Sequence, residues 1–518
     1  MNYLGDIPIE NAKKFPDHES VIFEETRLNW KQFNERINRL AAGLYKLGFK
    51  PGDHIAVLLE NCHQYMEIYY ALAKNGMVTV PLNYRLSEKE LDYIINHSEA
   101  KCLITGERFI EKTLSMKPNL KNIGKYVSVE VDAEGMTPYE KIIESGDSDE
   151  PDYKAGSEND MTVLMYTGGT TGLPKGVMLS HRNLLAALKA IGGTGSLPGA
   201  RTLLSLPLFH IANWQAFLFH MMNGCVIINR GANPEDILKL IMEEKPIMIN
   251  LVPTVYQYLL QLPDIEKMDF SHVLHFSVAG APMPPEHMKK CQKIFKMKFG
   301  KAYGLTEAAP TVSNLSGHEY ALEGDPQLVK RSKSVGKPFQ GIKVAIRREN
   351  GSECEAEEMG EITVLGDNVM LGYWRDPEKT AQTLRDGWLW TGDIGHMDED
   401  GYIYLADRKN DMIISGGENV YPNEVENALY QHPSVLEVAV VGVPDEKWGE
   451  AVRAVVVLKP GQKATEEELI AFCKTQIAGY KSPKSIDFVD DLPKTTVGKI
   501  RRSEVKEKYW ESQQKKVE

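Results

Sequence analysis

The segment Tyr166–Gly176, YTGGTTGLPKG, lies between two short apolar runs that each predict a strand. Met161–Met165 before it is typical of a buried strand, and Val177–His181 after it predicts a second one. The segment itself carries glycines, threonine hydroxyls and Lys175. Glycines allow backbone N–H groups to face an anion, hydroxyls add donors, and lysine adds a mobile positive charge. The segment therefore predicts a loop that binds a polyphosphate.

This loop differs from the Walker A loop, in which Lys directly follows Gly and a Ser or Thr then opens a helix. Here Leu173 and Pro174 separate Gly172 from Lys175, and a proline before the lysine argues against a helix start. A flexible Gly/Thr hairpin at the surface is the alternative interpretation.

Length and composition predict a multidomain globular protein. The chain has 518 residues, too many for one core, and its net charge of -12 argues against nucleic-acid binding. Six scattered cysteines without a Cys-x-x-Cys pair predict free thiols in a reducing, cytoplasmic compartment. The early charges at Asp6 and Glu10, without an apolar stretch, argue against a signal peptide.

The stretch from Thr202 to Asn229 contains no Asp, Glu, Lys or Arg and is long enough to span a bilayer. Pro207, His210 and other uncharged polar residues interrupt it, and such groups are costly in lipid. We therefore expect no membrane span here, but a buried strand and helix that line an apolar cavity.

Helical and strand patterns alternate from Thr26 to Val252, which predicts parallel α/β layers. Residues 130–160 are acidic and turn-rich, and we expect a solvated connection there. Residues 335–405 carry short strands with turns, typical of a small β unit. After about residue 410 a second α/β pattern of domain size follows. The predicted fold is a large multi-layer N-terminal α/β domain over 1–409, with the β unit, and a small mobile C-terminal α+β domain over 410–518.

Several further segments could carry chemistry. The small residues of Val278–Pro282 would let a planar ring approach the backbone. Lys301–Glu307, KAYGLTE, offers an aromatic face, a hydroxyl and a carboxylate that suits Mg²⁺. Trp388–Asp393 places a carboxylate at a turn, where Asp can accept from ribose hydroxyls. Taken singly, these segments are equally well explained by strand-end turns, core packing and solvated surface charges.

Three segments near the end of the chain add to this pattern. Asp407–Asp411 is a charged loop after a strand, Met412–Pro422 contains a glycine pair, and Leu492–Ile500 presents Lys499 directly after a glycine. In identity and order, all these segments together resemble the core motifs of the adenylate-forming superfamily. That superfamily comprises acyl-CoA synthetases, luciferases and peptide-synthetase adenylation domains. The resemblance covers nearly the whole chain and is densest from 160 to 500.

The resemblance implies binding of ATP and Mg²⁺ at specific residues. Thr306 would approach the α-phosphate, Glu307 would bind Mg²⁺ together with Thr170, and Lys499 would bridge the acid carboxylate and the α-phosphate. The residues expected at ATP or AMP are Thr167, Gly168, Gly169, Thr170, Thr171, Gly172, Lys175, Gly280, Ala281, Pro282, Ala302, Tyr303, Gly304, Thr306, Asp393, Arg408 and Lys499. Gly168 stands where the family often has Ser, so the loop has one hydroxyl fewer.

The resemblance also implies a place for the acid and for coenzyme A. Pro207–His210 resembles the segment whose last residue gates the acyl site, so His210 is also a catalytic candidate. The uncharged pocket candidates are His210, Ile211, Trp214, Val278 and Gly304. They suit a medium-chain, alicyclic or aromatic acid rather than a diacid or an amino acid. Ser415, Gly416, Gly417 and Glu418 resemble the loop that lines the CoA tunnel. Asn410 would be the hinge, where the family usually has Asp or Lys.

Four functions remain open at this point. They are an AMP-forming acyl-CoA synthetase, an adenylation enzyme that loads a separate carrier protein, a luciferase-type oxygenase and a non-catalytic ligand-binding relative. The chain ends soon after Lys499 without an appended carrier domain, which favours the first. Glu307 and Lys499 argue against the last. The acid, the direction of the reaction and the formation of a homodimer stay undetermined.

Overall fold

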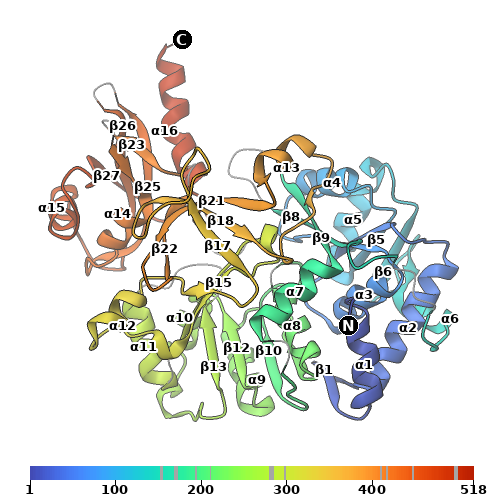
Figure 1. Cartoon of the computed structure of the whole chain (residues 1–518). Helices are drawn as coiled ribbons and strands as arrows, with labels where there is room; N and C mark the ends of the chain where they lie inside the picture. The colour runs from blue at the N-terminus through green and yellow to red at the C-terminus, as the bar shows by residue number, and fades with distance from the viewer. Residues whose placement is uncertain are drawn as a thin grey trace.

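The structure is a computed structural model that describes residues 1–517 apart from 152–155, 168–172, 193–194, 211, 279–284, 297–298, 409–410, 416–417, 446–447 and 495–499; for 212–213, 285–287, 408 and 511–517 it describes the backbone only. Over these residues the strands form four sheets. The N-terminal third lies at one end of the molecule and the C-terminal region at the opposite end (Figure 1).

The first sheet has eight strands and a largely parallel core. In spatial order they are β19 (Gly372–Tyr373), β9 (Lys175–Ser180), β8 (Met161–Thr167), β4 (Val78–Pro81), β3 (His54–Leu58), β5 (Cys102–Gly106), β6 (Lys125–Val129) and β7 (Thr137–Pro138). Every residue of β3 is buried, because helices cover both of its faces. Ile55 and Val57 pack into the same core as α3 (His63–Lys74), whereas Ala56 and Leu58 pack with α4 (Glu88–His97).

The second sheet has nine strands, again parallel at its centre. In spatial order they are β16 (Lys337–Pro338), β15 (Ser313–Leu315), β14 (Gly300–Tyr303), β13 (His275–Val278), β12 (Met248–Leu251), β10 (Arg201–Leu204), β11 (Cys225–Ile228), β1 (Glu19–Phe23) and β2 (Thr26–Asn29). Helix α8 (Ala212–Met221) packs on one face of it. The other face is covered by α9 (Pro234–Glu244), α10 (Pro253–Leu259) and α11 (Pro285–Phe295).

The predicted β unit is a five-stranded antiparallel sheet. It contains β17 (Lys343–Arg347), β18 (Gly360–Leu365), β21 (Trp388–Met397) and β20 (Leu384–Arg385), with β22 (Ile403–Arg408) paired to β21. Asp393 therefore lies inside a strand, so the prediction of a turn at this residue is wrong. The residue that suggested a turn is Gly392, which has a positive φ of 75° within the strand.

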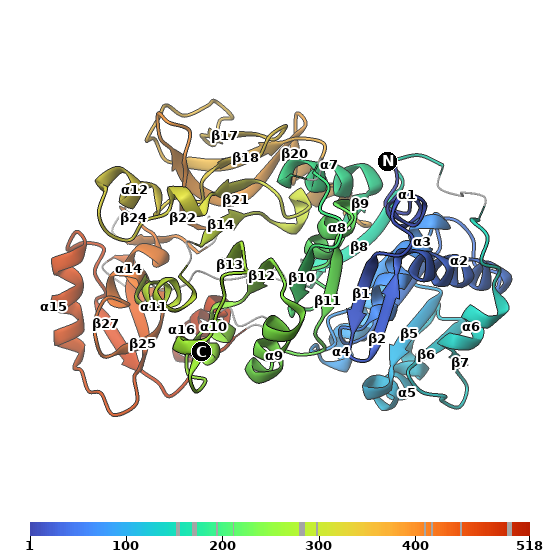
Figure 2. The same cartoon turned by 90° about the horizontal axis from the view of Figure 1, so that it is seen from below.

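The C-terminal region forms the fourth sheet, at the far side of the β unit from the N-terminus (Figure 2). Its strands are β24 (Glu418–Val420), β23 (Ile413–Ser415), β26 (Gly449–Leu458), β25 (Val435–Asp445) and β27 (Ser485–Phe488). Helices α14 (Pro422–Leu429) and α15 (Glu466–Gln476) share one core with this sheet. Helix α16 (Arg502–Val517) packs against its other face through Val505. The predicted second α/β unit is confirmed.

The remaining helices complete the layers. They are α1 (Asp6–Lys14), α2 (Trp30–Lys46), α5 (Ile110–Met116), α6 (Tyr139–Ser145), α7 (His181–Ile191), α12 (Pro326–Arg331) and α13 (Pro377–Thr383), with 3-10 turns at Glu107–Phe109, Lys117–Asn119, Ile265–Lys267, Thr306–Ala308 and Gly317–Glu319. Helix α6 lies in the stretch expected to be a solvated connection. Its Tyr139, Ile142 and Ile143 are buried, so that expectation is wrong for these residues.

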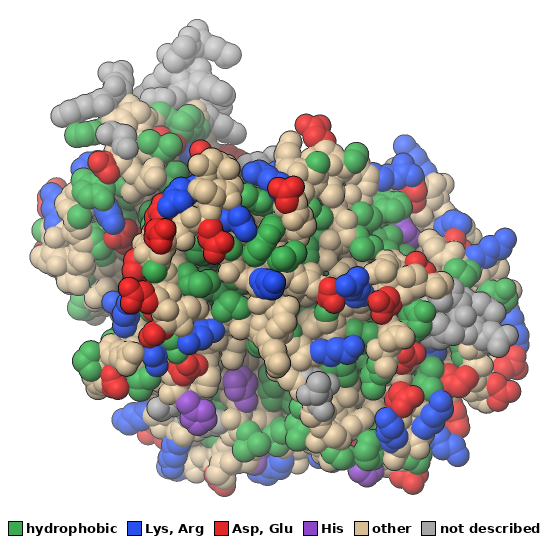
Figure 3. Space-filling view, in the orientation of Figure 1, with side chains coloured by type: hydrophobic (Ala, Val, Ile, Leu, Met, Phe, Trp, Pro, Cys, Tyr) green, Lys and Arg blue, Asp and Glu red, His purple; other side chains and the backbone are tan. Residues whose placement is uncertain are grey.

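The charge-free stretch forms β10, α8 and β11, and its residues are mostly buried in the core. Within the described residues, no helix is both long and apolar enough to cross a membrane. The expectation of a buried strand and helix is confirmed. Acidic and basic side chains are mixed over the face in Figure 3, which suits a globular surface.

Candidate active site

A single large cavity gathers most of the predicted site residues that the structure describes. It has a volume of about 3310 Å³ and is lined by residues from the three large sheets and from the C-terminal region. Predicted residues on its wall are Thr167, Lys175, His210, Trp214, Val278, Ala302, Tyr303, Gly304, Thr306, Glu307 and Asp393. Ligand pockets usually measure roughly 300–1,000 Å³, so this one has room for more than one substrate.

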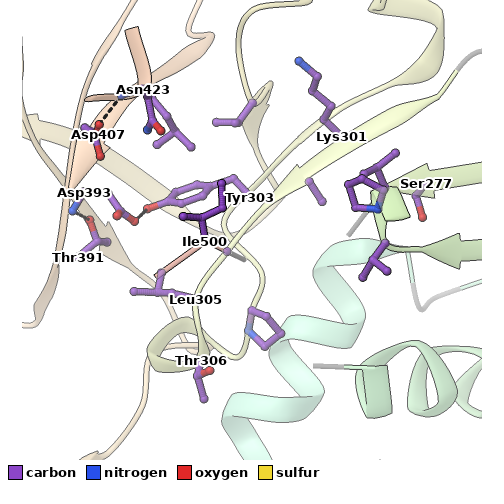
Figure 4. Close-up of a pocket in the computed structure, with 18 of the residues that line it drawn as sticks. Ser277, Lys301, Tyr303, Leu305, Thr306, Thr391, Asp393, Asp407, Asn423 and Ile500 are labelled. Atoms are coloured by element: carbon purple, nitrogen blue, oxygen red, sulfur yellow. Dashed lines mark hydrogen bonds between the residues drawn. The ribbon is translucent and has the colours of Figure 1, made fainter. Parts of the chain in front are cut away.

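Tyr303 and Asp393 are joined across two sheets. Tyr303 ends β14, and its hydroxyl donates a hydrogen bond of 2.5 Å to Oδ2 of Asp393 on β21 (Figure 4). Thr391 helps to position the carboxylate, because its Oγ1 accepts from the Asp393 backbone N–H at 3.1 Å. The backbone of Arg408 on β22 is in register with Asp393.

Glu307 is held by a residue that the sequence analysis missed. The hydroxyl of Tyr373 donates to Oε1 of Glu307 at 2.9 Å. Lys175 Nζ lies 5.8 Å from the centroid of the same tyrosine ring. Burial, reinforced by the nearby Glu307 charge, raises the pKa of Tyr373, so the phenol stays protonated and keeps donating. Tyr373 thus connects the metal-ligand candidate with the lysine of the phosphate loop.

Backbone geometry constrains three further candidates that the structure describes, namely Thr167, Gly304 and Thr306. Thr167 and Lys175 are register partners at the ends of the antiparallel strands β8 and β9, so the loop begins and ends at one point. A side chain at Gly304 would lie 2.0 Å from the carbonyl oxygen of Pro310, so only glycine fits this turn. The turn carries Thr306, the first residue of a 3-10 helix that includes Glu307.

The acyl-pocket candidates lie around α8. His210 and Trp214 line the cavity together with apolar side chains of the same helix, Leu218 and Phe219. Trp214 is 4% exposed, which agrees with a predicted wall position. Val278 ends β13 and also lines the cavity. The predicted apolar lining is present, but polar side chains of α8, β12 and β13 lie on the same wall.

Arg502, in the first turn of α16, joins the C-terminal region to β22. Its guanidinium contacts Oδ1 of Asp407 at 2.9 Å and Oε2 of Glu426 at 2.5 Å, and it also donates to Asn423. The backbone N–H of Asn423 donates to Oδ2 of Asp407 at 2.7 Å (Figure 4). Burial of Glu426 raises its pKa, with Arg502 opposing that shift. Sequence analysis gave no role to Arg502, because its partners come from distant segments.

The two described residues of the predicted CoA loop do not line this cavity. Ser415 and Glu418 are register partners in the β23–β24 hairpin, and neither of them lines the cavity. Ile500 does line it, and this residue directly follows Lys499 in the sequence.

Some predicted residues lie outside the described part of the structure. They are Gly168, Gly169, Thr170, Thr171, Gly172, Ile211, Gly280, Ala281, Pro282, Asn410, Gly416, Gly417 and Lys499, and Arg408 is described by its backbone only.

Comparison with known proteins shows which family the chain belongs to. A family model described as AMP-binding enzyme matches residues 9–374, and one described as AMP-binding enzyme C-terminal domain matches residues 424–499. The chain belongs to the AMP-binding enzyme family. As a member of it, this adenylate-forming enzyme has the mixed-sheet N-terminal and small C-terminal architecture predicted from the sequence.

Three relatives of this AMP-binding enzyme illustrate the similarity. Feruloyl-CoA synthase of Amycolatopsis sp is 37% identical over 98% of this chain and 99% of the relative. The long-chain-fatty-acid–CoA ligase of Bacillus subtilis (strain 168) is 36% identical over 98% of this chain and 95% of the relative. MatB from Rhodopseudomonas palustris, whose crystal structure was determined with bound ATP, is 28% identical in sequence. The two structures match with a TM-score of 0.87 over 98% of this chain and 99% of the MatB chain. Full-length similarity to acyl-CoA ligases places the chain among the AMP-forming acid:CoA ligases and supports ATP binding.

Proposed function

We propose that this AMP-forming ligase activates a medium-chain, alicyclic or aromatic carboxylic acid and transfers it to coenzyme A. The observation that carries the proposal is the shared cavity. It combines Lys175, Tyr303, Glu307 and Asp393 with an apolar wall from α8. Phosphate-binding, ribose-binding and acyl-binding groups are then within reach of one bound adenylate.

In the first half-reaction, a carboxylate oxygen attacks the α-phosphorus of ATP. The bond from that phosphorus to the bridging oxygen breaks, and pyrophosphate leaves with the electron pair. Both reactants are anionic, so cationic groups must stabilise the charge that gathers in the transition state. We assign this role to Lys499, with Lys175 and the Thr167–Gly172 loop at the β- and γ-phosphates and Thr306 near the α-phosphate.

Nucleotide recognition is assigned to the groups around β14 and β21. Tyr303 would stack on adenine beside Gly280, Ala281 and Pro282, with Ala302 and Gly304 next to it. Asp393 and Arg408 would bind the ribose hydroxyls. Their register pairing across β21 and β22 supports this assignment.

Mg²⁺ fits the donor set at Glu307. The described residues contain no cluster of three or more His, Cys, Asp or Glu side chains that could hold a metal alone. Mg²⁺ needs only one or two carboxylates when phosphate oxygens and water complete its shell. Glu307, oriented by Tyr373, would supply the carboxylate and Thr170 a hydroxyl. A bound Mg²⁺ would neutralise part of the phosphate charge.

In the second half-reaction, the CoA thiol attacks the acyl carbonyl, the thiol proton is released and AMP leaves. We assign Ser415, Gly416, Gly417 and Glu418 to the CoA tunnel and Asn410 to the hinge between domains 1–409 and 410–518. Ser415 and Glu418 do not line the present cavity, so this assignment requires the C-terminal domain to rotate. His210 would gate the acyl site. A cytoplasmic location suits the six free cysteines.

A single assay can distinguish between the possible acceptors of the acyl group. AMP formation is measured with ATP, Mg²⁺ and an active acid, adding coenzyme A, a purified acyl-carrier protein or neither. The proposal expects stoichiometric AMP and acyl-CoA with coenzyme A and little turnover in the other two arms. If AMP forms only when the carrier protein is present, the carrier protein is the acceptor in place of coenzyme A.

A further inference from the structure

Five buried polar atoms on the cavity wall have no hydrogen-bond partner among the described residues: one is Oγ1 of Thr311, and the other four lie on α8, β12 and β13. These four are Nε1 of Trp214, Oε1 of Gln215, Oδ1 of Asn250 and Oγ of Ser277. All four residues line the cavity, and Trp214 and Gln215 are only 4% and 7% exposed. A buried polar group without a partner is costly, so a native protein seldom gathers several in one place without a purpose.

These atoms come from elements that pack together. Asn250 on β12 and Ser277 on β13 are register partners, so their side chains project to the same face of the sheet. Helix α8 covers this face at β10, where Nε2 of Gln215 donates to Oγ1 of Thr202 at 2.6 Å and to the Leu203 carbonyl at 3.2 Å. These bonds fix the amide of Gln215 while its oxygen stays unpaired. We call the part of the cavity lining formed by these four residues, beside the apolar side chains of α8, the polar wall.

The chemistry of the polar wall matches a hydroxyl group. The oxygens of Gln215 and Asn250 can only accept, the indole N–H of Trp214 can only donate, and Ser277 can do both. A hydroxyl donates once and accepts as well, so it can pair with both kinds of group. An ether or a plain alkyl chain would leave the two acceptors without a donor.

Among the described residues of β12 and β13 on this face, none offers a fixed charge to an ionised substituent. Met248 and His275 lie two residues before Asn250 and Ser277 on the same strands and are themselves register partners. Burial lowers the pKa of His275, which favours its neutral form. A second carboxylate or an ammonium group would therefore be desolvated here without an opposite charge, which is costly.

We propose that the polar wall binds a neutral hydroxyl group of the acyl substrate, distant from its carboxylate, and so selects hydroxylated acids over their unsubstituted counterparts. The inference rests on the proposed acid-activating function and deepens it. Trp214, Gln215, Asn250 and Ser277 are then the specificity-determining residues for the acid.

The test compares acids that differ by one hydroxyl. Acid-dependent pyrophosphate release is measured with cinnamic and 4-hydroxycinnamic acid, and with octanoic and 8-hydroxyoctanoic acid. Because a site built for a hydroxyl rejects the analogue that lacks it, we expect kcat/KM to favour the hydroxylated acid at least ~10-fold in one pair. Equal values, or preference for the unsubstituted acid in both pairs, would overturn the inference. Absence of release with every acid would instead overturn the proposed function, and this inference with it.

Two variants distinguish recognition of the substrate hydroxyl by the polar wall from a purely structural role of its residues. In Ser277→Ala and Asn250→Leu, the ratio of hydroxylated to unsubstituted kcat/KM should fall towards one, while the value for the unsubstituted acid stays level or rises. Ser128→Ala is the matched control, because Ser128 is also a buried serine without a partner among the described residues but does not line the cavity. An equal loss for both acids in Ser277→Ala would contradict the inference. Should Asn250→Leu fail to fold, the wild-type ratio and Ser277→Ala still decide it.

Discussion

The hydroxyl of Tyr303 donates a 2.5 Å hydrogen bond to the carboxylate of Asp393, 90 residues further along the chain. This bond ties the strand that carries the predicted adenine-stacking ring to the strand that carries the predicted ribose ligand. Both side chains are more than nine-tenths buried, at 9% and 7% exposure. The bond therefore holds the two strands that carry the proposed nucleotide-binding side chains in a fixed arrangement before any ligand binds.

Asp393→Ala tests the ribose assignment. A hydrogen bond to a charged group contributes about 1.5–3 kcal/mol, so we expect kcat/KM for ATP to fall roughly 10- to 100-fold. The wild type should discriminate between ATP and 2′,3′-dideoxy-ATP, and Asp393→Ala should largely lose this discrimination. If the variant still prefers ATP as strongly as the wild type does, Asp393 does not bind the ribose hydroxyls.

Tyr373→Phe tests whether Tyr373 positions Glu307. The substitution keeps the ring near Lys175 but removes the hydroxyl that donates to Glu307. Loss of a group that orients a metal ligand typically weakens metal binding ~10- to 100-fold, so the half-saturating Mg²⁺ concentration should rise by about that factor. Tyr126→Phe, which alters a buried tyrosine that does not line the cavity, is the control. An unchanged Mg²⁺ requirement in Tyr373→Phe would exclude the positioning role.

Arg502→Ala should destabilise the C-terminal region strongly. The guanidinium neutralises Asp407 and Glu426, and removing it leaves two buried carboxylates without this positive charge. Breaking such a buried pair typically costs about 3–5 kcal/mol, which denaturant unfolding would measure. Arg501→Ala is the matched control, because the Arg501 side chain is 44% exposed and, among the described residues, forms a 3.6 Å ion pair with Glu504. Equal stability of the two variants would show that the buried network contributes little.

Stability should fall in acid partly through His220. Burial lowers the pKa of His220 from 6.5 to about 3. Between these two values the unfolded chain binds a proton on this ring and the folded chain does not, so lowering the pH favours unfolding. The slope attributable to this residue approaches about 1.4 kcal/mol per pH unit. Denaturant unfolding at several pH values below 6.5 should show a shallower slope for His220→Gln, and identical slopes would contradict the account.

The fold was largely predictable because its elements carry strong local patterns. The capping box of Ser87 and Glu90 is a local signal that begins α4, and the apolar residues from Phe33 to Leu44 form the buried side of α2. Helix α6 was missed because its few apolar residues lie within an acidic, turn-rich stretch, and packing stabilises it through Tyr139, which bonds to Glu67. Local composition could not reveal that partner.

The site was predictable where one contiguous motif carries the chemistry, as in Tyr303–Glu307. It was not predictable where function depends on contacts between distant segments. Tyr373 gains its role only by meeting Glu307, 66 residues away, and Arg502 by meeting Asp407, 95 residues away. The polar wall was missed for a related reason, since Asn250 and Ser277 become neighbours only through strand register.

The most direct test of the central claim is acid-dependent release of pyrophosphate from ATP, measured for the wild type and for Lys499→Ala. We predict that a suitable carboxylic acid triggers release in the wild type and that Lys499→Ala slows it roughly 10²–10³-fold, the effect of losing one preorganised electrostatic group. Both proteins should convert preformed acyl-adenylate and coenzyme A to thioester at more similar rates. If no acid draws pyrophosphate from ATP, or if both half-reactions suffer equally, the account is contradicted.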